Sequence, residues 1–469
     1  MEKNQKLEEF KKNISGKKVA VVGLGVSNIP LVRYLLQLSA NVTIFDKRPI
    51  EKLDVYLCEE FSNKGVKFSL GENYFSELKG FDYIFRSPSM RPDIKEVVEE
   101  VNRGAILTSE IEMLLELCPC KIIGVTGSDG KTTTTTLIYK ILCAEGYNCY
   151  LGGNIWTPLF SLIDEMKEDD VIVLELSSFQ LLTAKVSPQI AVVTNIAPNH
   201  LDIHKDYDEY INAKKNIFLN QNENDLVVLN YDNEITHSFA EEAIGKVRFF
   251  STHSELNNGV ILENETTINI VENGDKREVI NKDEILLLGR HNLENCCTAI
   301  AAVKDMVSIT AIREVLTTFK GVEHRNEFVR VYNGVTWRND AIGTSPSRTI
   351  AGLHSFDQKV ILIAGGYDKN LDYTELGKVI VEKVKALVLV GQTSTKIKNA
   401  TREAMKETMA LPKDLPIVEC QSLEEAVAEA RDFGTQGDIV FFSPASASFD
   451  MFKNFEEKGK KFKEIVNGL

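Results

Sequence analysis

The sequence lacks the features that mark membrane, secreted and zinc-binding proteins. It has no run of about 18 apolar residues, the length that a membrane-spanning helix needs. Its first residues, MEKNQKLEEFKKN, are charged and contain no apolar stretch of the kind found in secretory leaders. None of its 8 cysteines belongs to a C-x-x-C pair, so a zinc site is not expected. These absences predict a cytoplasmic protein with reduced thiols and no membrane partner.

The chain also lacks a surplus of positive charge. It has 54 Lys and Arg residues against 68 Asp and Glu residues, which gives a formal net charge of -14. Proteins that bind nucleic acid or dock on anionic lipid normally carry a basic surplus, so neither kind of partner is expected. An anionic substrate must therefore be bound by local hydrogen-bond donors and cations.

The composition is that of a globular protein, with 43% hydrophobic and 26% charged residues in 469. That length suggests about three domains, and we expect them at residues 1–108, 109–320 and 321–469. Short β-branched runs alternate with amphipathic helical stretches, which predicts α/β domains with buried parallel strands. The strand candidates are Lys18–Val22, Val42–Asp46, Tyr83–Arg86, Lys121–Val125, Val171–Glu175, Ile190–Thr194, Leu226–Leu229, Val360–Ala364, Ala386–Val390 and Ile439–Phe442.

One segment of the middle domain departs from this alternation. Residues 245–285 contain polar, alternating stretches such as VILENETTINIVENG. Alternation of this kind is typical of strands with one exposed face. We expect an antiparallel flap within the middle domain.

A glycine loop follows the first predicted strand. The segment Gly23-Leu-Gly25-Val-Ser27-Asn28 precedes a helix, and a second strand ends at Asp46, 21 residues after Gly25. This is the first βαβ unit of a Rossmann-like domain, in which backbone N–H groups receive a phosphate and the acidic residue accepts a ribose hydroxyl. Asn28 replaces the third glycine of G-x-G-x-x-G, which disfavours a nicotinamide ligand. A nucleotide diphosphate ligand and a tight turn needed only for packing both remain open, and Ser87 is placed to line the same crevice.

A second glycine loop joins the strand at 121–125 to a helix and reads Thr126-Gly-Ser-Asp-Gly-Lys-Thr-Thr-Thr134. Backbone N–H groups of such a loop hold phosphates, its lysine reaches their charge, and the hydroxyl that follows ligates Mg²⁺. The spacing is not that of Walker A, because Val125 stands where that pattern has glycine. The Gly130-Lys131-Thr132 core is intact, and it predicts ATP binding.

Three more positions are candidates for chemistry because of where they lie. Glu175 ends a predicted strand, His200 follows another, and Lys214 lies on a helix. A carboxylate at the carboxyl edge of a parallel sheet, beside a phosphate loop, can hold Mg²⁺. Each residue also has an interpretation without function, as a solvated surface residue. Strand-end acids and paired helix lysines such as Lys214-Lys215 are usually solvated.

Taken together, these segments resemble the Mur ligases, ATP-dependent amide-forming enzymes of peptidoglycan precursor synthesis. The resemblance extends from Gly23 to the C-terminus. It is carried by Gly124–Thr134, Glu175–Gln180, Asn195–His200, Ala213-Lys214, Gly289–Asn295, His324–Glu327, Asn339-Asp340 and Ser443–Gly459. It implies a Rossmann-like N-terminal domain that binds a UDP-linked substrate, a P-loop ATPase-like central domain, and a Rossmann-like C-terminal domain that binds an amino acid.

The resemblance also implies roles for individual residues. Catalysis would depend on Lys131, Glu175, His200 and Lys214, with Lys214 carbamylated by CO2. Two Mg²⁺ ions would be held by Thr132, Glu175, His200 and the Lys214 carbamate. ATP would contact Gly127, Ser128, Asp129, Gly130, Lys131, Thr132, Thr133, Asn292, Asn295, Arg325 and Asp340. The UDP-linked substrate would contact Val26, Ser27, Asp46, Arg48, Ser87 and Asn154, and the amino acid would contact Thr344, Lys369, Ser448 and Phe455.

Two signatures imply which member of the family this chain is most similar to. The Gly-x-Gly-x-Ser opening with Ser87-Pro-Ser, and the C-terminal segment Ser443–Gly459, are similar to the ligase that joins D-glutamate to UDP-N-acetylmuramoyl-L-alanine. The resemblance implies a monomer. One position departs from the family pattern, because Ile342 stands where many members have lysine. Arg348 is a candidate to supply the missing charge.

Four other kinds of protein would share some of these features: a related amide ligase, a noncatalytic homologue, an oxidoreductase and an interaction scaffold. Another Mur ligase, or an amide ligase similar to folylpolyglutamate synthetase, would share the phosphate loop and differ in its acceptor. A noncatalytic nucleotide-binding homologue would not need Lys131, Glu175, His200 and Lys214 together. An NAD oxidoreductase would need a second nicotinamide signal, and an interaction scaffold would need no phosphate loop.

Overall fold

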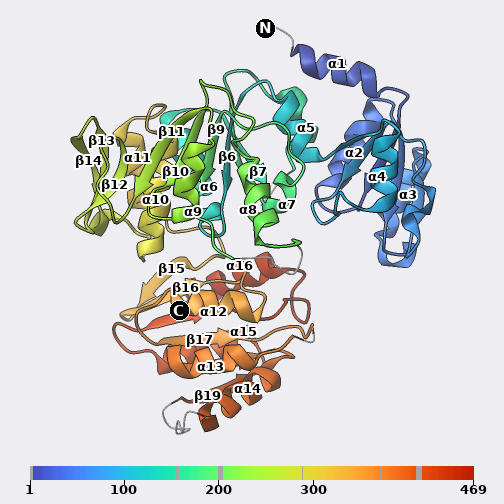
Figure 1. The fold of residues 1–469 in the computed structure, drawn as a ribbon. Helices are drawn as coiled ribbons and strands as arrows, with labels where there is room; N and C mark the ends of the chain where they lie inside the picture. Colours follow the sequence, from blue (N-terminus) through green and yellow to red (C-terminus); the bar gives the residue numbers. More distant parts are fainter. Residues whose placement is uncertain (1–3, 155–157, 199–203, 288, 370, 408–414) are drawn as a thin grey trace. The chain divides into compact units, whose positions relative to one another are not determined.

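The computed structural model describes residues 4–154, 158–198, 204–287, 289–369, 371–407 and 415–469. It confirms the predicted class: a mixed α/β protein of three domains, each built on one mainly parallel sheet with helices packed against it (Figure 1). The chain forms two compact units. The first contains residues 1–286 and 290–318, and the second contains residues 287–289 and 319–469.

The first sheet has five parallel strands in the order β3-β2-β1-β4-β5. This is a Rossmann-like order, in which the chain leaves β1 in one direction and later returns to its other side. The crevice between β1 and β4 is therefore a place where ligands bind. The strands are β1 (Lys18–Val22), β2 (Asn41–Asp46), β3 (Lys67–Leu70), β4 (Tyr83–Arg86) and β5 (Ile106–Thr108). The helices are α1 (Gln5–Ile14), α2 (Asn28–Gln37), α3 (Val55–Asn63) and α4 (Lys95–Asn102), and α5 (Glu110–Leu117) follows the last strand, at the boundary with the central domain.

The second sheet has nine strands in the order β14-β13-β12-β11-β10-β9-β6-β8-β7. The strands are β6 (Lys121–Thr126), β7 (Cys149–Gly153), β8 (Val171–Glu175), β9 (Ile190–Val193), β10 (Leu226–Asn230), β11 (Lys246–Ser251), β12 (Gly259–Glu263), β13 (Thr267–Glu272) and β14 (Asp275–Asn281). The helices are α6 (Lys131–Glu145), α7 (Ser178–Leu181), α8 (Tyr207–Lys215), α9 (Glu234–Ser238), α10 (Arg290–Val303) and α11 (Ile309–Thr318).

The expected flap is only partly correct. β12, β13 and β14 do pair antiparallel, as the polar alternation predicts. However, β11 pairs parallel with β10, and β12 pairs parallel with β11. These four strands therefore extend the main sheet and do not form a separate flap. The apolar pair Phe249-Phe250 within β11 gives the reason, since Phe250 is buried in the core.

The first two sheets share one apolar core. Phe160 of the central domain is fully buried and meets the rings of Phe10 and Tyr34 of the N-terminal domain edge-on. Edge-to-face aromatic contacts of this kind add stability beyond the burial of their area. The two domains consequently form one compact unit.

The third sheet has the order β15-β16-β20-β17-β18-β19, and only β15 pairs antiparallel. Its strands are β15 (Glu327–Tyr332), β16 (Val335–Asn339), β17 (Val360–Ala364), β18 (Val384–Val390), β19 (Ile417–Cys420) and β20 (Ile439–Phe442). Its helices are α12 (Pro346–His354), α13 (Thr374–Lys383), α14 (Ser394–Glu407), α15 (Leu423–Phe433) and α16 (Phe455–Asn467). Trp337, Phe442 and Phe462 pack together in its core.

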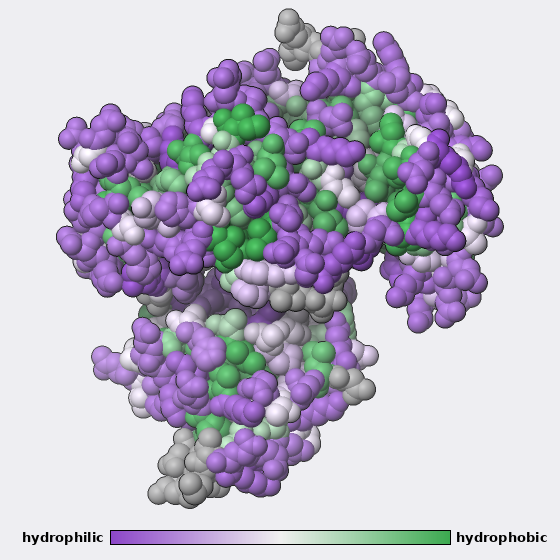
Figure 2. Space-filling model, in the orientation of Figure 1, coloured by the Kyte–Doolittle hydropathy of each residue, from purple (hydrophilic) through white to green (hydrophobic). Residues whose placement is uncertain are grey.

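The surface on the face drawn in Figure 2 is mainly hydrophilic, with apolar residues in small separate groups. Among the described residues, no helix is long and apolar enough to cross a membrane.

Candidate active site

The phosphate loop lies between β6 and α6, at the carboxyl edge of the second sheet. Gly127 and Gly130 have φ of +144° and +78°, backbone conformations that side chains rarely adopt. The loop is fixed from the next strand: Asp129 N–H donates to Asn195 Oδ1 at 2.9 Å, and Thr194 Oγ1 donates to the Asp129 carbonyl at 2.5 Å. Its backbone N–H groups therefore have a defined conformation before any phosphate binds.

Lys131 folds back over this loop. Its Nζ donates to the carbonyls of Gly127 and Ser128, both at 2.9 Å. Asn295, on α10, lies against the same loop, since a Cβ added at Gly130 would come within 2.2 Å of Asn295 Oδ1. Asn295 Nδ2 donates to Asn292 Oδ1 at 3.2 Å. The structure thus brings two predicted ATP contacts of α10 to the phosphate loop.

Glu175 ends β8 beside the first turn of α6. Thr132 Oγ1 donates to Glu175 Oε2 at 2.7 Å, and Asn154 Nδ2 donates to Glu175 Oε1 at 2.8 Å. The carboxylate is only 2% exposed, and both of these donors are neutral. A buried carboxylate that is held by neutral donors next to a hydroxyl suits a divalent cation. The structure therefore joins three predicted residues from three separate segments.

Lys214 lies in α8 and is 2% exposed, whereas the next residue, Lys215, pairs with Glu242. The Lys214 amine donates to the Gly127 carbonyl at 2.8 Å and to Thr126 Oγ1 at 3.3 Å, and it lies 4.8 Å from the centre of the Tyr210 ring. Burial, with the nearby Lys131 ammonium, holds the pKa of Lys214 well below its ordinary value. The amine is thus placed at the phosphate loop in a setting that favours its neutral form.

His200 falls outside the described residues. Within the described part of the chain, no group of three or more His, Cys, Asp or Glu side chains is placed to hold a metal ion. The candidate metal ligands there are Thr132 and Glu175, and the Lys214 amine contacts the same phosphate loop at the Gly127 carbonyl.

A pocket of about 710 Å³ opens at the crevice between β1 and β4. Asp46 lies in it, and its carboxylate accepts hydrogen bonds from Leu24 N–H and from the guanidinium and backbone N–H of Arg48. Burial alone would raise the pKa of Asp46, but these hydrogen bonds outweigh it and hold the pKa below its ordinary value. Ser87 also lines it. The pocket therefore offers a carboxylate, a guanidinium and backbone N–H groups to one ligand.

Three predicted substrate residues lie apart from this pocket. The side chain of Val26 is 75% exposed, and Ser27 precedes α2 without capping it through its side chain. Asn154 lies at the end of β7, beside Glu175. The unexpected Asn28 has a structural role, since its amide donates to the carbonyls of Val22 and Gly23. These bonds tie the start of α2 to the end of β1.

The second unit contains the remaining predicted residues. Asp340 follows β16 and is buried; it accepts hydrogen bonds from Ser443 Oγ at 2.8 Å and from Asn326 N–H at 3.0 Å. Burial raises the pKa of Asp340 to about 6, against the smaller opposing effects of these donors and of Arg325 and Arg348. Arg348 donates to the Ile342 carbonyl at 3.3 Å. A guanidinium therefore lies beside the position that lacks the family lysine.

The predicted amino-acid contacts of this unit lie on two adjoining segments, in the turn after β16 and on one helix. The segments that hold Lys369 and Ser448 are joined by a hydrogen bond from Tyr367 N–H to the Ala447 carbonyl. Lys369 Nζ lies 5.3 Å from the centre of the Phe449 ring. Ser448 Oγ is buried with no hydrogen-bond partner among the described residues, so it has a capacity that a ligand can satisfy.

Phe455 and Thr344 complete this set. Phe455 begins α16, and its ring lies edge-on to His324 at 6.1 Å. Thr344 N–H donates to the Ile342 carbonyl at 2.8 Å, which fixes the turn after β16.

Some residues of the site were assigned no role from the sequence. Tyr210 lies under the Lys214 amine and bonds Ser128 through its hydroxyl, at 2.8 Å. Thr194 and Asn195 fix the phosphate loop from β9. The position of Asn195, directly after a predicted strand, is the one signal that could have identified it. Nothing in the residue type of Tyr210 distinguishes it from a core tyrosine.

Family models match each of the three domains. The N-terminal domain of MurD-like Mur ligases matches residues 17–109, the Mur ligase middle domain matches residues 125–303, and the glutamate ligase domain of Mur ligases matches residues 324–446. The matches thus extend across all three sheets.

Relatives and solved structures agree with these matches. The UDP-N-acetylmuramoylalanine–D-glutamate ligase of Acetivibrio thermocellus is 54% identical over 466 residues, covering 99% of each chain. The enzyme of the same name from Ruminiclostridium cellulolyticum is 53% identical, covering 99% of this chain and 100% of its own. The UDP-N-acetylmuramate–alanine ligase of Thermotoga maritima has the same fold, with a TM-score of 0.57 at 17% identity, covering 96% of this chain and 99% of its own. MurF of Acinetobacter baumannii has it too, with a TM-score of 0.54 at 15% identity, covering 97% and 92%.

Proposed function

Since the chain belongs to the Mur ligase family, we infer that it is an ATP-dependent ligase that adds D-glutamate to UDP-N-acetylmuramoyl-L-alanine in peptidoglycan precursor synthesis. The observation that carries this proposal is the 54% identity with a D-glutamate ligase over 99% of both chains. The identity includes the acceptor domain, and it therefore bears on the substrate as well as on the ATP chemistry.

The reaction must join a carboxylate to an amine in water, which requires activation of the carboxylate. An oxygen of the L-alanine carboxylate attacks the γ-phosphorus of ATP, the bond to the β-phosphate oxygen breaks, and ADP leaves an acyl phosphate. The amine nitrogen of D-glutamate then attacks the acyl carbon and loses a proton. Collapse of the tetrahedral intermediate gives the amide and inorganic phosphate.

The phosphate loop supplies the donors for this charge. In our proposal Lys131 turns from the carbonyls of Gly127 and Ser128 toward the phosphates, while Asn292 and Asn295 contact ATP from α10. Bringing two anions together is the main electrostatic obstacle, so a fixed cation at this point is the largest catalytic contribution we expect. We propose that backbone N–H groups of the loop and of the first turn of α6 also contact the phosphates, apart from those of Ser128 and Asp129, which donate to Asn195.

Glu175 and Thr132 are the residues that would hold Mg²⁺. Their oxygen ligands fit a hard divalent cation, and Glu175 is buried beside neutral donors. When bound, the ion neutralises charge on the phosphates. Asn154 keeps the second carboxylate oxygen oriented, and we propose that it also contacts the muramoyl-alanine portion of the substrate.

We further propose that Lys214 is carbamylated. CO2 adds to a neutral amine, which loses a proton and becomes a carbamate anion. The low pKa of Lys214 supports the neutral form that this addition needs. The resulting anion, with His200, would provide ligands for a second Mg²⁺.

The N-terminal pocket suits the uridine diphosphate of the substrate. We propose that Arg48 and the N–H groups after β1 receive the diphosphate, that Asp46 accepts hydroxyl groups, and that Ser87 also lines the site. Val26 and Ser27 lie beyond the pocket wall in this structure, at the loop before α2, and would contact the ligand from there.

In the same proposal the C-terminal domain binds ATP through Arg325 and Asp340 and binds D-glutamate through Thr344, Lys369, Ser448 and Phe455. The unsatisfied hydroxyl of Ser448 supports this assignment. Arg348 supplies the positive charge that Ile342 lacks, because its guanidinium reaches the Ile342 carbonyl.

We also propose that the domain boundaries lie near residues 108 and 320. We propose that the protein is a monomer and that it is located in the cytoplasm.

The test is phosphate release from ATP and Mg²⁺ in the presence of UDP-N-acetylmuramoyl-L-alanine, with D-glutamate, L-glutamate, L-alanine, L-lysine and meso-diaminopimelate compared as acceptors. We expect release with D-glutamate alone. Release with another acceptor would keep the family and overturn the acceptor. An absence of release with every acceptor would favour a noncatalytic homologue.

A further inference from the structure

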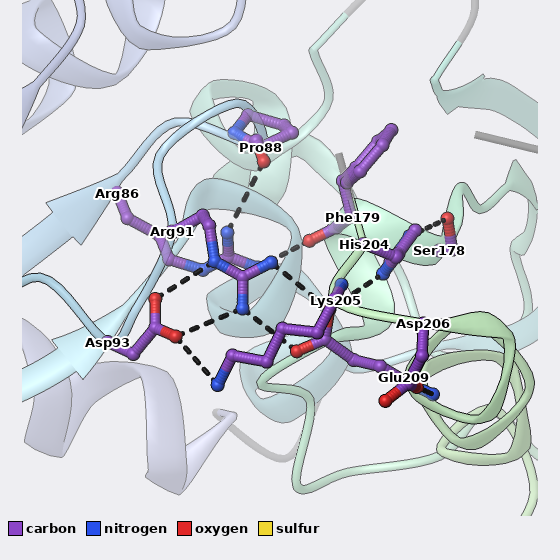
Figure 3. Close-up of polar contacts among 10 residues, drawn as sticks. All are labelled: Arg86, Pro88, Arg91, Asp93, Ser178, Phe179, His204, Lys205, Asp206 and Glu209. Carbon is purple, nitrogen blue, oxygen red and sulfur yellow. Dashed lines mark hydrogen bonds and ion pairs between the residues drawn. The ribbon is translucent and has the colours of Figure 1, made fainter. Parts of the chain in front are cut away.

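The loop that follows β4 has two neighbours at once. Ser87, Ser89, Met90 and Arg91 line the N-terminal pocket. Arg86, the last residue of β4, contacts α7 of the central domain, and Arg91 of the loop contacts α8 (Figure 3). A ligand that fills the pocket therefore touches the loop whose Arg91 contacts the central domain.

Arg86 fixes the base of this loop. Its side chain is 1% exposed, and its guanidinium donates to the Met90 carbonyl at 3.0 Å, to the Phe179 carbonyl at 2.5 Å and to Thr183 Oγ1 at 3.0 Å. One buried cation thus ties the pocket wall directly to α7. Because removing a buried hydrogen-bonded charge disrupts packing generally, Arg86 is a poor site for a test.

Arg91 makes the second connection. Its Nη2 and Nη1 donate to Glu209 Oε1 at 2.9 Å and to Oε2 at 3.1 Å, a two-point geometry with directional specificity. Its other face is held by Asp93. The Arg91 hydrogen bonds hold the pKa of Glu209 at about 2, so the pair stays charged at neutral pH. Both side chains are partly buried, which reduces the screening that weakens surface ion pairs.

Glu209 links the Arg91 ion pair to the segments that contain Glu175 and Lys214. It accepts from Lys205 N–H and lies 3.2 Å from His204 Nδ1, and His204 Nε2 lies 2.9 Å from Ser178 Oγ. Ser178 comes three residues after Glu175, and Glu209 comes five residues before Lys214 on the same helix. This hydrogen-bond network therefore connects the segment that contains Glu175, the candidate metal ligand, with the helix that contains Lys214, the candidate carbamate residue.

We propose that Arg91 is a positioning residue that couples occupancy of the N-terminal pocket to the ATP site through Glu209. The inference rests on the proposed function, because it takes the pocket ligand to be the UDP-linked substrate. A substrate in the pocket fixes the loop of residues 87–91, Arg91 then fixes α8, and α8 presents Lys214 to the phosphate loop. Since coupling between two binding sites is reciprocal, nucleotide must also tighten binding of the UDP-linked substrate.

The experiment measures the affinity of the full-length protein for a non-hydrolysable ATP analogue with Mg²⁺ by calorimetry. Each titration is done without and with saturating UDP-N-acetylmuramoyl-L-alanine. For the unchanged protein we expect the substrate to tighten analogue binding at least about fivefold. In Arg91→Met and in Glu209→Gln, we expect that ratio to fall to about 1. Analogue affinity without the substrate should stay within about twofold, since neither residue contacts the phosphate loop.

Two further variants separate coupling from simple loss of structure. Arg33→Met removes a two-point ion pair with Glu60 inside the N-terminal domain and should keep the full ratio. The reversed pair Arg91→Glu with Glu209→Arg should regain part of it. Glu209→Gln lies outside the pocket and preserves side-chain shape, so it provides the test if Arg91→Met does not fold.

The proposal is overturned if both ligands bind and the ratio is already 1 in the unchanged protein, or if Arg91→Met and Glu209→Gln keep it. That result leaves the proposed function intact. If neither the substrate nor the analogue binds, the proposed function fails, and this inference fails with it.

Discussion

At the scale of single residues, two adjacent lysines show how burial decides chemistry. Lys214 and Lys215 follow each other on α8, but Lys214 is buried against the phosphate loop and Lys215 pairs with Glu242. Burial disfavours the charged form of an amine, and it holds the pKa of Lys214 well below its ordinary value. Lys214 therefore has the neutral form that reaction with CO2 needs.

Replacing this lysine tests the carbamate directly. Lys214→Ala should lower the ligase rate by about a hundredfold or more, because the site loses the proposed carbamate, which would be a metal ligand. Added short carboxylates such as acetate or formate should restore part of the rate by occupying the cavity. Lys215→Ala should remain close to the unchanged protein and should not respond. A Lys214→Ala variant with nearly full activity would contradict the carbamate.

Asp340 gives a prediction about pH. Its raised pKa, about 6, means that the folded protein holds this proton more tightly than the unfolded chain. The associated stability is present in acid and is lost as the pH rises through 6. Asp340→Asn, which removes the titration, should therefore gain about 1 kcal/mol in free energy of unfolding relative to the unchanged protein between pH 5 and pH 8.

The same variant should lose about a hundredfold in rate, because an amide cannot replace the carboxylate in the contacts with ATP that we propose. Urea unfolding at the two pH values and the phosphate-release assay provide the measurements. Asp357→Asn, at an exposed position of the same domain, should change neither quantity. A stability difference that does not move with pH would contradict this interpretation of Asp340.

Sequence reasoning reaches some of these residues and not others, for physical reasons. The Gly130-Lys131-Thr132 core and the strand-end position of Glu175 predict a phosphate and metal site, because strand ends of a parallel sheet meet at one edge. Tyr210 has no such signal. Its role depends on which helix face packs against the loop, and that is set by tertiary contacts.

At the scale of elements, helix α6 has a left-handed glycine at each end. Gly130 precedes its first turn with φ of +78°, and Gly146 follows its last turn with φ of +106°. The two positions differ in their surroundings. A Cβ at Gly130 would meet Asn295 Oδ1 at 2.2 Å, whereas a Cβ at Gly146 meets nothing within 4 Å.

The two glycines therefore form a matched pair. Gly146→Ala should cost about 1–2 kcal/mol of stability through backbone strain and leave nucleotide affinity within about twofold. Gly130→Ala should carry the same strain and also displace Asn295, so nucleotide affinity should fall at least about tenfold. Calorimetry with an ATP analogue and thermal unfolding separate the two effects. Equal nucleotide affinity in both variants would contradict the placement of Asn295.

Strands marked by a run of buried β-branched residues could be predicted from the sequence. Features that depend on which strands pair, and in which direction, could not. Buried β-branched runs located β1, β4, β8, β17 and β20 at the bounds that the structure has. The expected flap was wrong in part because alternation reports an exposed face and says nothing about strand direction. The direction of β11 depends on β10, its neighbour in the sheet.

At the scale of the whole molecule, the chain passes between its two units near residues 287–289 and again at 318–319. The phosphate loop belongs to the first unit, and the predicted amino-acid residues belong to the second. The proposed acyl phosphate must be protected from water until the amine attacks, so we expect the two units to come together during the reaction.

Small-angle X-ray scattering tests this closure. The radius of gyration should decrease when an ATP analogue, Mg²⁺, UDP-N-acetylmuramoyl-L-alanine and D-glutamate are added together. Closure should need ligands of both units, so D-glutamate alone should have no effect. An unchanged radius with all ligands bound would contradict a closing reaction cycle.

Residues that act together across the molecule are the least accessible to sequence reasoning. Arg91 and Glu209 are 118 residues apart and on different domains, and both look like solvated surface residues in the sequence. Their pairing depends on how two sheets pack, which no local pattern encodes. Chain length and hydrophobic periodicity correctly indicated three α/β domains, because neither signal depends on how the domains pack.

The most direct test of the central claim follows an oxygen atom through the reaction. UDP-N-acetylmuramoyl-L-alanine labelled with ¹⁸O in both carboxylate oxygens is incubated with ATP, Mg²⁺ and D-glutamate, and the released phosphate is analysed by mass spectrometry. An acyl-phosphate pathway predicts one ¹⁸O atom in each phosphate, with release dependent on D-glutamate. Phosphate without label would show that the carboxylate never bonded to phosphorus, and it would contradict the account.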